Sequence, residues 1–335
     1  MSLNSKTASI LDEITDAVSR GYDKMTEAEL FTAAEYSPEE SEFTASTGYS
    51  YWKSTLRIFS HNRVAMFFLV MIVCILAFTF IQPYIPGQKP ATLIHNDGAG
   101  MQIRNAKPCA EFWFGTNSIG QDLWSLVWSG TRTSLLIGFA VALIEAFAGI
   151  SIGVLWGYVR KLDFFFTELY NIFDNIPQTL MLILISYILR PGVRTIIIAL
   201  SLTGWLMTAR FIRNQVVTLR DRDYNLASRS LGTPTRRIIL KNLLPYLVSV
   251  IAMRMAMAIP LTISSEVFVT YIGLGLPNSI PSLGNLVTSG IDKILEPGLR
   301  YQLLFPTGVL SLVTISFYII GNAFADASDP KNHIV

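Results

Sequence analysis

Four ionisable side chains stand inside long apolar runs of this sequence. They are Glu145, Asp174, Arg254 and Glu266. Ionisable groups at membrane depth line polar paths or pair between helices, and they are functional candidates by default. Two interpretations stay open for each: contact with a polar substrate along a translocation path, or a structural role between helices. Arg254 and Glu266 cannot pair within one helix, because twelve residues of helix span about 18 Å.

The residue patterns of catalysis and nucleotide binding are absent from the sequence. The dipeptide Gly-Lys does not occur, so there is no Walker A phosphate loop. The histidines, His61, His95 and His333, are scattered and have no metal-ligand spacing. The G-x-S-x-G match at residues 149–153 lies inside the apolar run at 132–158, so it has no strand-to-helix turn and is not a nucleophile elbow. We therefore expect no catalytic residue, no metal and no cofactor in this chain, and we predict that it is not an enzyme.

The elements that position the four ionisable residues are predicted to be membrane-spanning helices. The chain has 335 residues, of which 51% are hydrophobic and 15% charged, whereas soluble domains carry about 25% charged residues. Residues 64–81 contain no charge, and about 20 apolar residues cross the hydrocarbon core. We predict an all-α integral membrane protein with about six spans, at residues 64–85, 132–158, 164–189, 195–217, 246–273 and 303–325.

The basic residues predict the orientation of these spans. No early apolar core stands in residues 1–50, so we expect no secretory signal and an N-terminus on the inside. Lysine and arginine then concentrate on the inner side, most of all in residues 210–241, as the positive-inside rule requires. We therefore expect a multi-pass protein of the cell membrane with both termini in the cytoplasm.

The chain divides into four predicted regions. Residues 1–50 hold ten acidic and three basic residues, a composition typical of loosely ordered segments. The regions are an acidic cytoplasmic extension (1–55), a first span with an extracellular segment (56–130), a five-helix core (131–325) and a cytoplasmic tail (326–335).

A basic segment, DRDYNLASRSLGTPTRRIILKNLLP at residues 221–245, separates the fourth and fifth spans. Its spacing predicts a helix that begins with Asp223 as N-cap. Gly232 then supplies a left-handed residue that ends the helix. One less polar face is expected on this helix, at Tyr224, Ala227, Ser228 and Leu231.

A second short helix is predicted after Gly232. Thr233 is expected to be its N-cap, with Pro234 at its first position. Pro245 marks the start of the fifth span. The segment is thus expected to stand out from the membrane as a helical hairpin rich in arginine, including Arg229. Such a hairpin either binds anionic lipid at the membrane surface or docks into the groove of a soluble partner.

The spacing of this segment resembles the cytoplasmic signature of binding-protein-dependent ABC importer permeases. That signature reads Glu-Ala-Ala, three residues, Gly, nine residues, Ile, one residue, Leu-Pro. The matching positions here are Ala227, Gly232, Leu244 and Pro245. The departures are Leu226 in place of Glu, Ser228 in place of the second Ala, and Asn242 in place of Ile.

Three other segments are similar to the dipeptide/oligopeptide branch of that family. They are residues 114–135, 264–286 (SSEVFVTYIGLGLPNSIPSLGNL) and 325–331 (ADASDPK). In the first, Asn117 and Gln121 depart from the pattern. The positions in step there are Phe114, Gly115, Thr116, Gly120, Asp122, Gly130, Arg132, Ser134 and Leu135. The resemblance is closest to the second permease subunit of oligopeptide importers of Gram-positive bacteria.

This resemblance implies a type I ABC importer permease fold and a transport role for oligopeptides. It implies a homologous permease partner, two cytoplasmic ATPases that bind ATP and Mg, and an extracellular peptide-binding protein, with no nucleic acid. Residues 86–130 would face that binding protein. The segment 221–245 would hold coupling helices that contact an ATPase, through Tyr224, Ala227, Ser228, Arg229, Leu231, Gly232, Thr233, Pro234, Leu244 and Pro245.

Other functions stay open at this point. Related permeases carry dipeptides, nickel or glutathione. A self-contained secondary transporter is a further alternative, but it predicts an internal repeat with paired broken helices, and no convincing repeat is found in the sequence.

Overall fold

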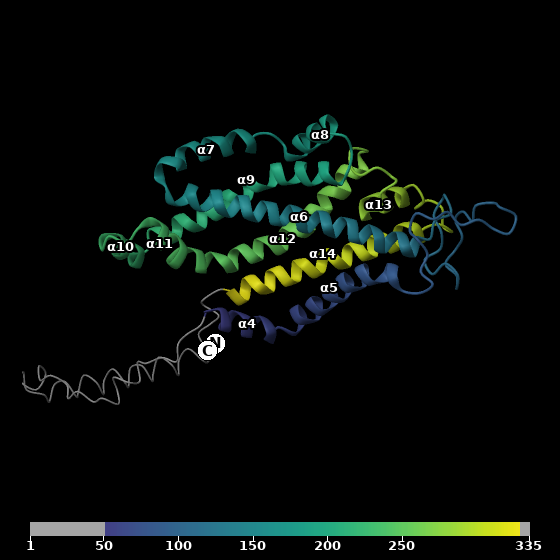
Figure 1. The fold of residues 1–335 in the computed structure, drawn as a ribbon, viewed down its shortest axis with the longest axis horizontal. Coiled ribbons are helices and arrows are strands. Elements are labelled where there is room, and N and C mark those ends of the chain that lie inside the picture. Colours follow the sequence, from purple (N-terminus) through teal and green to yellow (C-terminus); the bar gives the residue numbers. More distant parts are fainter. Residues whose placement is uncertain (1–50, 329–335) are drawn as a thin grey trace, which may run out of the picture. The chain divides into compact units, whose positions relative to one another are not determined.

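The computed structural model describes residues 51–328, and helices dominate this part of the chain (Figure 1). The helices are α4 (Tyr51–His61), α5 (Arg63–Ile81), η1 (Gln82–Tyr84), α6 (Leu123–Tyr158), α7 (Arg160–Asp174), α8 (Gln178–Ile188), α9 (Val193–Arg220), α10 (Asp223–Ser230), α11 (Thr235–Ile238), the π-helix η2 (Ile239–Leu243), α12 (Leu244–Tyr271), α13 (Leu283–Ile291) and α14 (Tyr301–Ser328).

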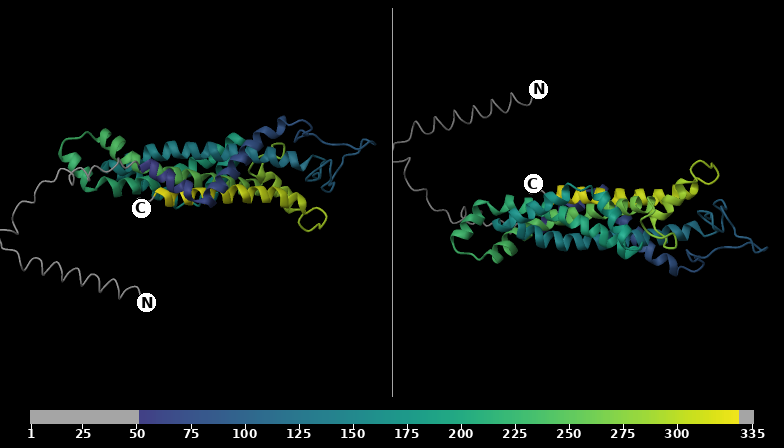
Figure 2. Two further views of the ribbon diagram at one scale, coloured as in Figure 1. Left: turned by 90° about the horizontal axis from the view of Figure 1, so that it is seen from below. Right: turned by 90° about the horizontal axis from the view of Figure 1, so that it is seen from above.

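Five of the described helical segments are long and apolar enough to cross a membrane. They are residues 63–84, 123–158, 193–220, 250–271 and 301–328. The prediction of an all-α membrane protein is confirmed. Figure 2 shows the long helices side by side, with α10 and α11 at one end of the bundle and the segment between η1 and α6 at the opposite end. The acidic extension predicted for residues 1–55 lies mostly outside the described residues.

The third predicted span, at residues 164–189, is not one continuous helix. It consists of α7 and α8, separated at residues 175–177. Pro177 explains the break, because it has no N–H to donate and it disfavours helical geometry in the residue before it. Neither helix is long enough to cross a membrane by itself, and both lie along α9 (Figure 1).

Helix α6 begins nine residues earlier than the span predicted at 132–158, because Asp122 caps it. The Oδ2 atom of Asp122 accepts a hydrogen bond from the Ser125 amide at 3.1 Å. With 36 residues, α6 is about 54 Å long. It packs closely on α9: a Cβ atom on Gly153 would lie 2.5 Å from the Ala209 carbonyl oxygen. Small residues at such positions permit close approach of membrane helices.

Two short helices were missing from the sequence prediction. Helix α13 lies in the Gly/Pro-rich segment after α12, where the Ser282 hydroxyl accepts from the Asn285 amide at 3.0 Å. Helix α4 comes before the first span and packs on the end of α14, with the Phe59 and Phe324 rings in edge contact. The apolar core otherwise lies where α6, α9, α12 and α14 meet.

Candidate coupling and translocation sites

Helix α10 is the most exposed helix of the hairpin predicted at residues 221–245. All its side chains except Asn225 and Ser228 are exposed, and Leu231, directly after it, is 85% exposed. Tyr224 and Leu226 add exposed apolar surface. The less polar face predicted for this helix thus faces outward, together with the guanidinium group of Arg229.

Gly232 has the left-handed backbone conformation that the sequence predicted, with φ of +78°. Around it, the Gly232 amide donates to the Arg229 carbonyl at 2.9 Å and the Thr233 amide donates to the Ser228 carbonyl at 3.0 Å. These bonds satisfy carbonyls that the helix end would leave free. The chain therefore reverses sharply at Gly232.

Both predicted N-caps in the hairpin are wrong by one residue. Arg222 precedes α10, and Asp223 is the first helical residue. In that position its carboxylate still stabilises the helix, because it interacts favourably with the positive end of the helix dipole. Pro234, not Thr233, is the N-cap of α11, with an extended ψ of 142°. Proline fixes φ and favours extended geometry before a helix, so it takes the cap position that a hydroxyl would otherwise fill.

The return half of the hairpin continues into the fifth span without interruption. Helix α11 passes into the π-helix η2 and then into α12, where Pro245 occupies the first turn and follows Leu244. A wide π turn before a proline relieves the clash between its ring and the preceding turn. Ile238 and Leu243 are fully buried against α6 and α9. The return half of the hairpin and α12 are therefore one continuous helical segment.

Two asparagines join the two halves of the hairpin, and neither was predicted from the sequence to do so. The Asn242 amide on η2 donates to the Asn225 side-chain oxygen at 3.0 Å. The Asn225 amide donates to the Leu219 carbonyl at 2.8 Å. Asn225 is 0% exposed. The departure from Ile at position 242 was the available signal, because a polar residue in that position needs a buried partner.

Two arginines fix the ends of α6, α7 and α9 beside the hairpin. Arg220 donates to the Gly157 carbonyl at 2.8 Å and pairs with Asp221 at 2.9 Å. Arg213 makes two hydrogen bonds to Asp163, at 2.8 and 2.9 Å. The hydrogen bond from the Arg220 guanidinium holds the pKa of Asp221 below its usual value. The base of α10 is thus attached to a rigid helix junction.

Glu266 lies where α6, α12 and α13 meet. It is 0% exposed, and its carboxylate accepts hydrogen bonds from the hydroxyls of Ser134 at 3.0 Å, Ser282 at 3.0 Å and Thr270 at 3.2 Å. A Cβ atom on Gly284 would lie 2.6 Å from this carboxylate. This geometry favours the structural interpretation of Glu266, as a tie between helices.

Glu145 and Arg254 line one small cavity between α6, α9 and α12. The Nε atom of Arg254 is buried and has no hydrogen-bond partner within the described chain, and the same holds for the Thr208 hydroxyl beside it. Glu145 lies against Gly204, which has no room for a Cβ atom. The structure brings these two sequence candidates together, but it keeps both apart from Glu266.

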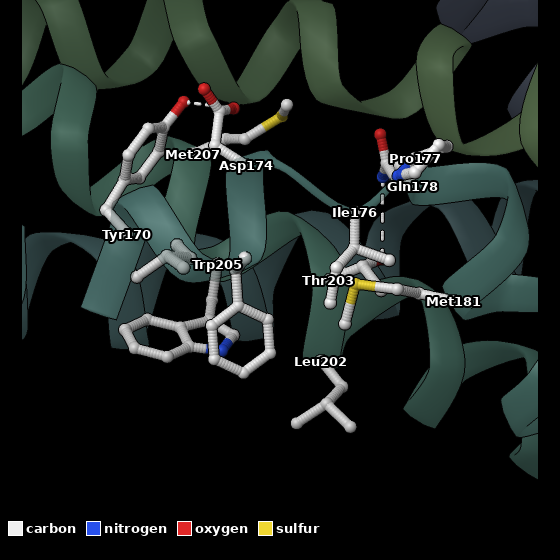
Figure 3. A pocket seen from close by; sticks show the side chains of 12 residues that line it. Tyr170, Asp174, Ile176, Pro177, Gln178, Met181, Leu202, Thr203, Trp205 and Met207 are labelled. Atoms are coloured by element: carbon white, nitrogen blue, oxygen red, sulfur yellow. Dashed lines mark hydrogen bonds between the residues drawn. The ribbon is translucent and has the colours of Figure 1, made fainter. Parts of the chain in front are cut away.

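Asp174 lies at the end of α7, on the rim of a cavity of about 240 Å³ between the α7–α8 break and α9 (Figure 3). Tyr170 donates to its carboxylate at 2.7 Å. Gln178 donates to the Thr203 hydroxyl at 3.4 Å across the other part of the cavity. The remaining lining is apolar and aromatic. Asp174 is exposed, unlike Glu266.

The described residues thus form a bundle of membrane-length helices with an exposed helical hairpin at one end. Residues 149–333 match the family described as binding-protein-dependent transport system inner membrane component, and residues 50–108 match the N-terminal TM domain of oligopeptide transport permease C. The chain belongs to the binding-protein-dependent transport system inner membrane components. It is a multi-pass membrane permease and not an enzyme.

Relatives match the chain over most of its length. The oligopeptide transport system permease protein AmiD of Streptococcus pneumoniae is 38% identical over 88% of this chain and 94% of the relative. The oligopeptide transport system permease protein OppC of Bacillus subtilis is 31% identical over 90% of this chain and 97% of the relative. A solved chain of the MetNI methionine ABC transporter, facing inward, aligns with a TM-score of 0.47 at 20% identity, over 59% of this chain and 96% of that chain.

Proposed function

We propose that this chain is a permease subunit of an ATP-driven importer that translocates oligopeptides delivered by an extracellular binding protein. It works beside a homologous permease and two cytoplasmic ATPases, which bind ATP and Mg, and both of its termini face the cytoplasm. The names of AmiD and OppC support oligopeptides as the substrate class.

The observation that carries this proposal is the contrast between the exposed surface of α10 and its rigid base. The helix exposes Tyr224, Leu226 and Leu231, while Asn225 ties it to both flanking elements. An element that couples two sites must move as a unit between two arrangements. A loosely attached helix would dissipate an applied force, whereas this helix passes it to α9 and α12.

The contact that α10 offers to an ATPase is largely apolar and basic. Leu226 stands where related permeases have Glu and is 43% exposed. An exposed leucine adds to docking through buried apolar area, whereas a glutamate would need a cationic partner. We therefore expect the groove of the ATPase to be apolar at this point, with acidic groups near Arg229.

Dipeptides are the second candidate substrate. The dipeptide transport system permease protein DppC of Bacillus subtilis is 32% identical over 90% of this chain. Both classes share a peptide backbone, so the permease core does not by itself distinguish them.

The test is uptake by proteoliposomes that hold the complete transporter with its receptor. A labelled oligopeptide is expected to accumulate only when ATP and receptor are present, and unlabelled dipeptide is expected to compete poorly. Strong competition by dipeptide would favour the second candidate. Transport at full rate by liposomes that hold this chain alone would overturn the proposal.

A further inference from the structure

The break between α7 and α8 leaves backbone groups without partners. Within the described chain, the carbonyl oxygens of Asp174, Asn175 and Ile176 receive no hydrogen bond. All three residues are exposed. The break lies beside Leu202, Thr203 and Trp205, which are near the middle of the membrane-length helix α9. Free carbonyls at this depth are tolerated only where they face water or protein, and not lipid.

The cavity beside the break combines an apolar floor with polar ends. Met181, Leu202 and Trp205 supply apolar and aromatic lining. Figure 3 shows Asp174 and Tyr170 at one end and Gln178 with Thr203 at the other. Binding sites for small organic groups share this composition, since apolar walls give affinity and a few polar groups fix orientation.

The charge at the rim of the cavity is negative. Asp174 accepts from the Tyr170 hydroxyl and forms no ion pair within the described chain. Arg210 on α9 stacks on the Tyr170 ring, with its Cζ atom 3.9 Å from the ring centre. An exposed carboxylate at membrane depth without a cationic partner is complementary to a cation that comes from outside the chain.

We propose that the α7–α8 break and its cavity form a contact site for the passing peptide. Asp174 binds a cationic group of the peptide, the free carbonyls of the break accept from its backbone amides, and the cavity takes an adjacent apolar side chain. This inference rests on the proposed function. It assigns to Asp174 a path role that Glu266 does not share, because Glu266 is enclosed by its own hydroxyl partners.

The lining chemistry favours a peptide over a lipid chain, and access of water to the break separates a peptide from a side chain of the partner permease. A lipid acyl chain would fill the apolar floor but would leave three carbonyls and a carboxylate unsatisfied, which costs several kcal/mol for each group in hydrocarbon. A fixed partner side chain satisfies some of these groups permanently, and it would exclude water from them. A peptide carries cation, amide donors and apolar side chains together.

The first test measures access of water to the break in the complete transporter. Cys74 and Cys109 are exposed free cysteines, so both are first replaced by alanine. Ile176→Cys is then compared with Val73→Cys, an exposed position on the unbroken helix α5. A charged, membrane-impermeant thiosulfonate is expected to modify Ile176→Cys at least about tenfold faster than Val73→Cys, because only a hydrated thiolate reacts.

Peptide transport in the presence of excess peptide is expected to slow the modification of Ile176→Cys. Equal, slow modification at both positions would indicate lipid or a fixed partner chain and would overturn the proposal.

The second test measures charge selection during transport. Wild type, Asp174→Asn and Asp174→Glu transporters are compared for uptake of two peptides that differ only by lysine or norleucine. Asp174→Asn is expected to lower the lysine-to-norleucine ratio of uptake about fivefold, or about 1 kcal/mol, while Asp174→Glu keeps the ratio. Receptor affinity, measured separately, is expected to be the same in all three.

The outcomes separate this inference from the proposed function. If wild type imports both peptides and Asp174→Asn leaves their ratio unchanged, the contact site is wrong and the importer assignment stands. If wild type imports neither peptide with ATP and receptor present, the proposed function itself is wrong.

Discussion

The Asn242 side chain donates a hydrogen bond to the Asn225 side chain at 3.0 Å, across seventeen residues of sequence. This bond joins α10 to η2, and the second bond of Asn225, to the Leu219 carbonyl, joins α10 to α9. One buried side chain therefore connects the exposed helix to both membrane helices that flank it. Because Asn225 is 0% exposed, the loss of either bond leaves a polar group unsatisfied away from water.

The Asn225–Asn242 bond predicts a defect in energy coupling when it is removed. Asn225→Leu is expected to destabilise the attachment of α10 by about 1–3 kcal/mol, the usual cost of disrupting a buried hydrogen-bond network. Peptide uptake is expected to fall steeply, while ATP hydrolysis by the assembled transporter continues. Paired measurements of uptake and ATP hydrolysis check this expectation.

A double-mutant cycle is the control for that prediction. Asn242→Leu and the double variant complete the cycle, and an interaction energy of about 0.5–3 kcal/mol between the two positions is expected. Additive effects of the two substitutions would show that the asparagines act separately and would contradict a shared role.

Gly232 predicts a second defect, through backbone geometry. A left-handed conformation costs a residue with a side chain about 1–2 kcal/mol, so Gly232→Ile is expected to displace Leu231 and abolish uptake without preventing membrane insertion. Gly232→Asn is the matched substitution, because asparagine tolerates this conformation, and it is expected to retain most uptake. Gly308→Ile controls for the added bulk, because a Cβ atom added to Gly308 would meet no atom within 4 Å. Equal uptake by Gly232→Ile and wild type would contradict the coupling role.

The hairpin was largely predictable from the sequence because glycine and proline act locally. The left-handed turn at Gly232 follows from residue type. The observed caps lie one residue away from the predicted ones, because helix ends fray and local preferences define them only to within a residue or two.

The roles of the ionisable residues were not predictable, because they depend on contacts far apart in the sequence. Glu266 meets Ser134 across 132 residues, and Arg220 reaches Gly157 across 63. A single sequence states that a charge lies in an apolar run, but not whether hydroxyls surround it. The position of a residue in the sequence therefore could not show that Glu266 is enclosed by hydroxyl groups while Asp174 is exposed.

The ion pairs at the base of the hairpin predict a loss of stability in acid. Hydrogen bonds from Arg213 and Arg220 lower the pKa values of Asp163 and Asp221, respectively. In the folded protein the pKa of each of these two carboxyl groups lies below its unfolded value of about 3.9. Their contribution to the stability of the fold is therefore complete above pH ~3.9, and it is lost as the pH falls through the folded-state pKa. The melting temperature of the purified transporter is expected to fall less steeply below pH ~4 in Asp163→Asn than in wild type. Parallel curves for the two proteins would contradict this role of Asp163.

Glu266 predicts a loss of folding that can be separated from any loss of transport. Glu266→Ala leaves the hydroxyls of Ser134, Ser282 and Thr270 without their common acceptor, and it is expected to cost about 3 kcal/mol or more. Glu266→Gln keeps one acceptor oxygen and the side-chain volume, so it is expected to preserve most of the stability. Melting temperature in detergent measures the first effect, and uptake per folded transporter measures the second. If Glu266 ties helices together, uptake per folded molecule is the same in Glu266→Gln and wild type. A strong loss of uptake in a Glu266→Gln protein of normal stability would instead place this carboxylate on the peptide path.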